Sequence, residues 1–180
     1  MTQRKSLFLG LLVGLLQTAL LLAVGSRLLL DRLHYPRAWA RTVPVDPNLP
    51  IRGRYVDLQV EVPVIDWSAA YQPLGKDHGQ IPLQLNIRQD RLFASPSTRK
   101  IDGKQEILIP TWRISHLPEG SIAQLPYRLA FFIPPDVPDP SLRPAGEKLW
   151  VEVTLPNQGP VRPIQLGVER DGQIEPLSLR

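Results

Sequence analysis

All 20 prolines of this 180-residue chain lie at or after Pro36, and from Pro36 to Pro176 no proline-free stretch exceeds 13 residues. Proline breaks helical hydrogen bonding, so a helix of more than about three turns has almost no room in that part of the chain. The first 35 residues carry no such restriction. The proline distribution therefore predicts an N-terminal segment that is free to be helical, followed by a longer part built from strands and turns.

Residues 7–25 form a nearly unbroken apolar run, interrupted only by Gln17 and Thr18. A helix needs roughly 20 apolar residues to cross the hydrocarbon core of a bilayer, so the run has the length of a transmembrane helix. A cleaved secretory signal is the alternative, because segment 1–6 is basic. We favour a retained anchor, since signal h-regions span only about 7 to 15 residues. The helical pattern continues beyond residue 25 until Pro36 stops it.

Charge supports a division of the chain into a basic N-terminal segment 1–6, a transmembrane helix 7–25, a basic juxtamembrane segment 26–41 and a β-rich domain 42–180. Residues 1–41 hold six of the 21 Lys and Arg residues and one of the 17 acidic residues, which leaves 15 basic and 16 acidic residues for the domain. A nearly neutral domain argues against nucleic acid as a partner, because phosphate binding needs a basic face. We expect the basic flank to contact anionic lipid.

The flanking charges leave the orientation of the anchor open. Four arginines follow the apolar run and only two basic residues precede it, so a literal count by the positive-inside rule places the domain in the cytoplasm. We expect an extracytoplasmic domain instead, because long domains translocate despite flanking charge. The expected location is the cell membrane, with a single pass. The absence of cysteine is compatible with either side.

Period-two alternation of apolar and polar residues predicts three strands, at 56–62, 81–88 and 149–155. Weaker patterns predict further strands at 105–109, 127–133, 161–168 and 173–179. Asp171-Gly172 is a turn dipeptide between the last two. The predicted fold class is all-β: a single antiparallel β-sandwich or open barrel, tethered by one N-terminal transmembrane helix.

Catalytic and metal-binding motifs are few. The three histidines, His34, His78 and His116, lie far apart in the sequence, and there is no cysteine to join them. A metal site would require these residues to converge over long range, so we predict no metal and no cofactor. No glycine-rich phosphate loop is present either.

Two groups of polar residues invite a catalytic interpretation. Asp77 and His78, with Ser68, suggest a hydrolase, although no nucleophile signature surrounds any serine. Asp136 and Asp139 suggest an acid–base pair, although in a proline-rich loop they are more typical of turn formation. We therefore expect the protein not to be an enzyme.

One octapeptide, residues 53–60, resembles the signature of the GDYXXLXY family of membrane-anchored proteins. Gly53, Tyr55 and Leu58 match the signature, whereas Arg54 replaces its Asp and Val60 replaces its last Tyr. That family has an N-terminal spanning helix, a basic stretch, a Val-Asp-Pro element, here at residues 45–47 after Val43-Pro44, and the octapeptide at the start of a strand. The order is similar over most of this chain, up to the final segment 171–177.

The resemblance implies a membrane anchor and a membrane-protein partner, and it implies no catalytic residue. The function predicted is that of a non-enzymatic accessory or assembly module. Its partners would be membrane lipid, through residues 7–25, and another integral membrane protein. The alternative is a membrane-anchored hydrolase that acts on envelope material.

The octapeptide also poses a question of strand parity. In a regular strand Leu58 and Val60 face the core, which places Tyr55 on the wet face. Either a bulge at Gly53-Arg54 turns Tyr55 inward, or Tyr55 stays outward, where it would cover the 66–80 excursion or meet a partner.

Overall fold

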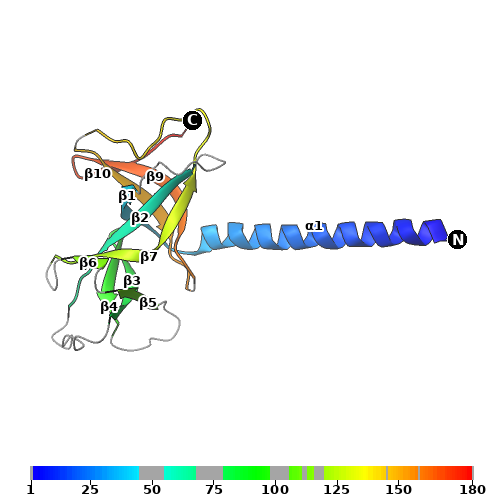
Figure 1. Ribbon diagram of the computed structural model, residues 1–180, viewed down its shortest axis with the longest axis horizontal. Coiled ribbons are helices and arrows are strands. Elements are labelled where there is room, and N and C mark those ends of the chain that lie inside the picture. Colours follow the sequence, from blue (N-terminus) through cyan, green and yellow to red (C-terminus); the bar gives the residue numbers. More distant parts are fainter. Residues whose placement is uncertain are drawn as a thin grey trace. The chain divides into compact units, whose positions relative to one another are not determined.

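The computed structural model describes residues 2–44, 55–67, 79–97, 106–110, 113–115, 120–144, 146–157 and 159–179. The chain divides into two compact units, Met1–Tyr35 and Pro36–Arg180. The described residues form one helix and ten strands (Figure 1). These elements are α1 (Thr2–His34), β1 (Arg37–Pro44), β2 (Tyr55–Pro63), β3 (Gln80–Arg88), β4 (Arg91–Pro96), β5 (Glu106–Pro110), β6 (Ile114–Ser115), β7 (Ile122–Phe132), β8 (Lys148–Thr154), β9 (Arg162–Arg170) and β10 (Gln173–Pro176).

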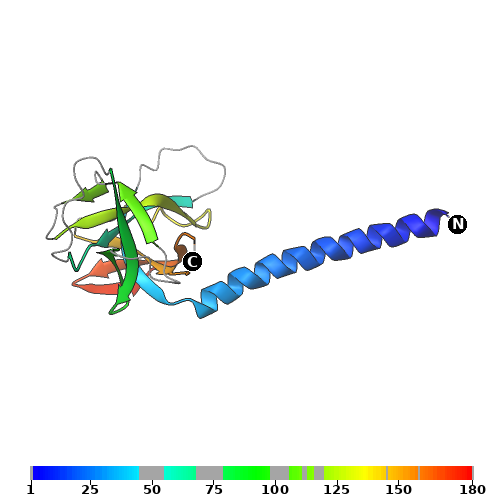
Figure 2. The ribbon, with the colours of Figure 1, turned by 90° about the horizontal axis from the view of Figure 1, so that it is seen from below.

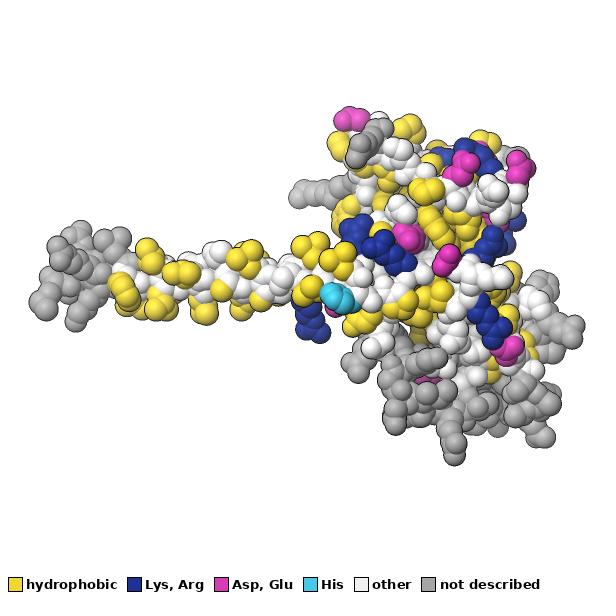
Figure 3. Space-filling view, turned by 180° about the vertical axis from the view of Figure 1, so that it is seen from behind, with side chains coloured by type: hydrophobic (Ala, Val, Ile, Leu, Met, Phe, Trp, Pro, Cys, Tyr) yellow, Lys and Arg dark blue, Asp and Glu magenta, His cyan; other side chains and the backbone are white. Residues whose placement is uncertain are grey.

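The first unit is the single helix α1, which runs without interruption over 33 residues (Figure 2). Its part Phe8–His34 is long and apolar enough to cross a membrane, with a mean hydropathy of 2.2. Hydrophobic side chains are exposed along it (Figure 3). Thr18 Oγ1 donates to the Gly14 carbonyl at 2.8 Å, so this hydroxyl is satisfied within the helix. The helix ends two residues before Pro36, as the sequence predicts.

The second unit is a β-domain built on one ten-stranded sheet. Its main path runs in the order β10-β9-β8-β1-β2-β7-β6, and each pair of neighbours on this path is antiparallel. β3 leaves this path and pairs with both β4 and β5. The β9–β10 hairpin turns at Asp171 and Gly172, both with positive φ, as a two-residue hairpin turn requires.

One pairing departs from the antiparallel arrangement that the sequence predicts. β4 runs parallel to β1 through the pair Trp39 and Arg91, and the Trp39 N–H donates to the Asp90 carbonyl at 2.7 Å. A second parallel bridge joins Val64 to Ala94. These two contacts connect the β3–β4–β5 group to the main path, so the sheet is mixed rather than purely antiparallel. The β-rich class with an N-terminal helix is confirmed.

The alternating segments supply the core of the β-domain. Leu58, Val60 and Val62 on β2 are fully buried, and Val151 and Val153 on β8 are buried with them. Burial of each such side chain contributes roughly 1.5–3 kcal/mol relative to exposure. The strands predicted at 56–62, 81–88 and 149–155 correspond to β2, β3 and β8, and the weaker patterns correspond to β5, β7, β9 and β10.

β1 is one of three strands that the sequence did not predict, together with β4 and β6. It occupies residues that we assigned to the juxtamembrane segment 26–41, and it continues into the domain we began at residue 42. Ala38 and Ala40 of this strand are buried. The alternate positions carry Arg37, Trp39 and Arg41, so the sequence pattern resembles a basic flank and gives no clear signal of a core strand. The folded unit therefore begins at Pro36.

Candidate functional site

The octapeptide spans the start of β2, and the structure describes its last six residues. Leu58 and Val60 have no exposed surface, so these two positions belong to the core, as their parity predicts. Val60 keeps the core face apolar where the family signature has Tyr. Gly53 and Arg54 lie outside the described residues, and the bulge proposed there is not described.

Tyr55 lies on the outer face of the sheet. It stands opposite Phe132 in the β2–β7 register, and the two ring centroids are 6.2 Å apart with planes tilted by 59°. This is the geometry of a favourable aromatic pair. Phe132 is 76% exposed, so the pair presents an aromatic surface to solvent. Asp57, on the same face, pairs with Arg128 at 3.1 Å.

The outer face of the sheet also holds a groove of about 250 Å³, which we call the charged groove. Its walls come from β1, β2, β4, β7, β8 and β9. It is lined by Arg41, Glu61, Pro63, Arg91, Leu92, Phe93, Ile122, Lys148, Trp150 and Glu169. Cross-strand register creates it, because Glu61, Arg41 and Trp150 are direct neighbours across β2, β1 and β8.

Three cations and two carboxylates pair inside the charged groove. Arg41 Nε lies 3.7 Å from Glu61 Oε2. Glu169 receives the other two, with Arg91 Nη2 at 3.6 Å from Oε1 and Lys148 Nζ at 3.7 Å from Oε2. These separations are longer than hydrogen bonds. Arg91 Nη2 also donates to the Gly172 carbonyl at 3.4 Å, which uses one of the five N–H donors of that arginine, so further N–H donors of the three cations remain available.

Trp150 forms part of the groove wall and is itself buried. The guanidinium carbon of Arg91 lies 5.0 Å from the Trp150 ring centroid, within the range of a cation–π contact. On its edge, Trp150 Nε1 donates to Glu169 Oε2 at 3.3 Å. The indole and the carboxylate together hold Arg91 in one position over the ring.

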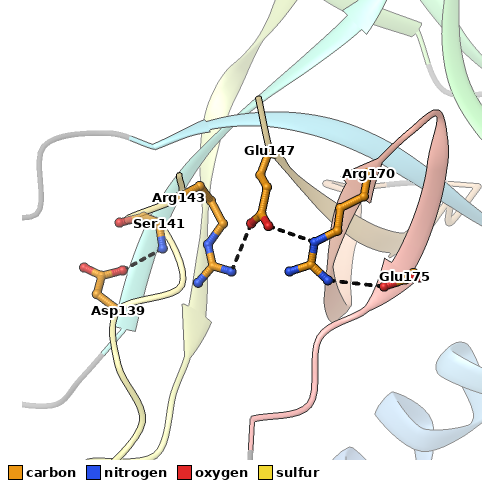
Figure 4. A network of polar contacts seen from close by, with 6 residues as sticks. All are labelled: Asp139, Ser141, Arg143, Glu147, Arg170 and Glu175. Carbon is orange, nitrogen blue, oxygen red and sulfur yellow. Dashed lines mark hydrogen bonds and ion pairs between the residues drawn. The ribbon is translucent and has the colours of Figure 1, made fainter. Parts of the chain in front are cut away.

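A second polar cluster fixes the loop between β7 and β8 (Figure 4). Glu147 lies between two arginines: Arg170 Nε donates to its Oε1 at 2.8 Å, and Arg143 Nη1 is 3.7 Å from its Oε2. Arg170 also contacts Glu175 at 3.3 Å. The hydrogen bond and charge of Glu147 raise the pKa of Arg170 above its ordinary value. This cluster ties the loop to the β9–β10 hairpin.

Tyr127 is a titratable group that the domain partly buries, and it packs against the core. Burial raises the pKa of its phenol above the ordinary value, because the low-dielectric surroundings disfavour the phenolate. A hydrogen bond from the Val161 N–H to Tyr127 Oη, at 3.2 Å, opposes part of that shift.

The residues that suggested catalysis are not assembled in the described part of the chain. Asp139 Oδ1 accepts a hydrogen bond from the Ser141 N–H at 2.8 Å, which is a turn contact, and Asp136 is exposed. His34 is the one histidine within the described ranges, and its Nδ1 lies 2.9 Å from the Leu30 carbonyl. Within those ranges, no group of three His, Cys, Asp or Glu side chains is placed to hold a metal ion. The other residues of the hydrolase and metal interpretations, namely Ser68, Asp77, His78 and His116, lie outside the described residues.

Sequence reasoning did not identify the charged groove. It treated Arg41 as a membrane flank and did not single out Arg91, Lys148 or Glu169. The alternation along β8 contained part of the signal, because it places Lys148 and Trp150 on the same face of the strand. The other members come from strands distant in sequence, and only the strand order brings them together.

Comparison with protein-family models, with curated proteins and with solved structures gave no match to this chain.

Proposed function

We propose that the chain is a membrane-anchored, non-enzymatic accessory or assembly module, whose β-domain contacts another integral membrane protein. The observation that carries this proposal is the Tyr55–Phe132 pair. Tyr55 is the first residue of β2, and it lies with Phe132 on the outer face of the sheet. Leu58 and Val60 of the same octapeptide belong to the core on the opposite face. The exposed aromatic pair therefore lies outside the core to which these two residues belong.

The anchor in this proposal is α1. Its apolar part is longer than the run needed to cross a bilayer, and its large side chains are exposed rather than packed in a core. A helix of this composition is stabilised by lipid around it. We place the protein in the cell membrane as a single-pass protein with an extracytoplasmic domain, and we assign it to the GDYXXLXY family on the octapeptide and the order of its segments.

The contact surface in this proposal is aromatic. Tyr and Phe are enriched at protein interfaces, because large rigid rings bury much area for little loss of side-chain entropy. Phe132 has three quarters of its surface in water, so covering it with a partner is favourable. The nearby Asp57–Arg128 ion pair supplies a polar rim to the same surface.

The test is quantitative affinity purification of the full-length protein from detergent-solubilised membranes. We expect one integral membrane protein to co-purify with the wild type and to be lost with Phe132→Ser. Leu142→Ser is the matched control, because Leu142 is 70% exposed on the loop between β7 and β8. Equal recovery of that membrane protein with Phe132→Ser and with Leu142→Ser would contradict the proposal. Hydrolysis of envelope material by the purified protein, abolished by His78→Ala, would establish the hydrolase instead.

A further inference from the structure

We infer that the charged groove is a binding site for a phosphate-containing anion, supplied by the headgroup of an anionic lipid. It is a site distinct from the Tyr55–Phe132 surface, and its argument does not depend on a protein partner. Three cations from three different strands, Arg41, Arg91 and Lys148, line the same cavity. Convergence of cations from β1, β4 and β8 is the arrangement that a multivalent anion requires.

The two carboxylates in the groove are recessed, and the cations are not. Glu61 and Glu169 side chains are each 14% exposed, whereas the three cations are 41–55% exposed. An anion that approaches from solvent therefore meets positive charge first. The three cations and two carboxylates of the groove together carry a net charge of about +1. The carboxylates hold the cations in position from below rather than shield them from solvent.

The cations also retain the donors that an anion needs. Their ion pairs with Glu61 and Glu169 are all longer than 3.5 Å. Arginine offers five N–H donors and lysine three, in positions that suit phosphate oxygens. Trp150 limits the movement of the Arg91 guanidinium, which lowers the entropy lost when an anion binds.

The position of the groove in the chain favours a lipid as the source. Arg41 follows His34, the last residue of the apolar helix, by seven positions. A basic residue this close in sequence to an apolar helix favours an anionic lipid headgroup as the source of the anion. A free phosphate compound offers the same chemistry, so the experiment includes both sources.

The experiment is isothermal titration of the full-length protein in a non-ionic detergent at low ionic strength. The probes are glycerophosphoglycerol, which is an anionic lipid headgroup without acyl chains, glycerophosphocholine, which is zwitterionic, and inorganic phosphate. We expect glycerophosphoglycerol to bind more tightly than the other two. Stronger binding of inorganic phosphate at the same residues would keep the anion site but identify a soluble ligand. Equal binding of glycerophosphocholine and glycerophosphoglycerol would overturn the proposal.

Two substitutions that change the charge of the groove in opposite directions distinguish an effect on anion binding from an effect on folding. Lys148→Ala removes a cation and is expected to weaken binding about fivefold, the equivalent of about 1 kcal/mol for one basic side chain near an anionic headgroup. Glu61→Gln removes a recessed negative charge and is expected to strengthen binding, which a folding defect cannot do. Gln keeps the shape of Glu61 and its contact with Gln124.

Arg88→Ala is the matched control, because Arg88 is another exposed arginine in an ion pair on a strand, and it does not line the groove. We expect this variant to bind as the wild type does. If Arg88→Ala weakens binding as much as Lys148→Ala, or if Glu61→Gln does not strengthen it, the groove is not the site.

Discussion

The Trp39 indole lies directly over Gly167. A Cβ atom built on Gly167 would be only 2.6 Å from Trp39 Cζ3 and 3.0 Å from Ile174 Cγ2. Gly167 stands opposite Trp150 on β8, and Trp39 is on β1, so the indole reaches diagonally across β8 to β9. The missing side chain at 167 makes room for that indole, and it thereby links the hairpin of β9 and β10 to the first strand.

Removal of β1 tests where the folded domain begins. A fragment from Pro36 to Arg180 retains β1 and is expected to unfold cooperatively, with circular dichroism dominated by strand. A fragment from Thr42 loses the residues of β1 that pair with β8, including Trp39. We expect the shorter fragment to be strongly destabilised or unfolded. The measurement is the melting temperature of each fragment, recorded under the same conditions. Equal melting temperatures would show that the folded domain does not require the residues before Thr42.

Gly167→Ala is expected to destabilise the domain by roughly 1–3 kcal/mol, because the added methyl group collides with the indole. Gly79→Ala serves as the control, since nothing lies within 4 Å of a Cβ at that position. Urea denaturation measures both variants. If contact with Trp39 causes the loss, a smaller side chain in Trp39→Leu should reduce the cost of Gly167→Ala in a double-mutant cycle.

Leu58→Ala tests the core face of β2. The side chain is fully buried, so its truncation is expected to cost about 2–5 kcal/mol in the free energy of unfolding. Arg88→Ala, at an exposed ion pair with Asp66, should change stability by less than about 0.5 kcal/mol. A loss below about 0.5 kcal/mol for Leu58→Ala would show that the register of β2 is wrong.

Tyr127 predicts how stability changes at alkaline pH. Its pKa in the folded domain is raised above the ordinary value of 10.0. As pH rises past about 10, the unfolded chain therefore loses its phenolic proton first, and stability falls until the pH passes the folded-state pKa. Tyr127→Phe should remove this part of the alkaline loss, although it leaves the Val161 N–H without its partner. Denaturant titrations give the free energy of unfolding of the wild type and of Tyr127→Phe at several pH values from 8 upward. The change with pH in the difference between the two proteins is the contribution of the Tyr127 phenol.

The proposed topology predicts the behaviour of the full-length protein in cells. It should remain with the membrane after carbonate extraction, and its N-terminus should be retained. A Ser178→Cys variant provides the only thiol in the chain, at an exposed position of the described domain. Labelling by an impermeant reagent in intact cells, with the outer membrane permeabilised where one exists, supports an extracytoplasmic domain. Protection under these conditions reverses the orientation, and a soluble product that begins near Ser26 refutes the anchor.

Sequence patterns predicted those parts of the fold whose signal is local. Val56, Leu58, Val60 and Val62 alternate cleanly, and the apolar helix ends where Pro36 requires it to end. β4 was missed because the turn before it, Gln89-Asp90, lacks glycine, although both residues adopt positive φ.

The candidate sites were harder to predict, because they depend on which strands become neighbours. Nothing local to Phe132 indicates that it will stand beside Tyr55, more than seventy positions earlier in the chain. Likewise, Arg91 and Trp150 meet only because β4 joins β1, a single parallel contact that no alternation pattern encodes. Local physics determines which face a residue occupies, and strand order determines its neighbours on that face.

The central place of β1 has a consequence for the order of folding during synthesis. Of the ten described strands, β1 is the first to leave the ribosome, yet it lies between β2 and β8, and Thr42 Oγ1 donates to the Leu149 carbonyl 107 positions later. Contacts of such long sequence separation form slowly, because a large loop must close first. The nascent domain therefore keeps one side of its first strand unpaired until β8 has been made. A message truncated before Lys148 would yield a chain with an open strand edge, which is prone to pair with other chains.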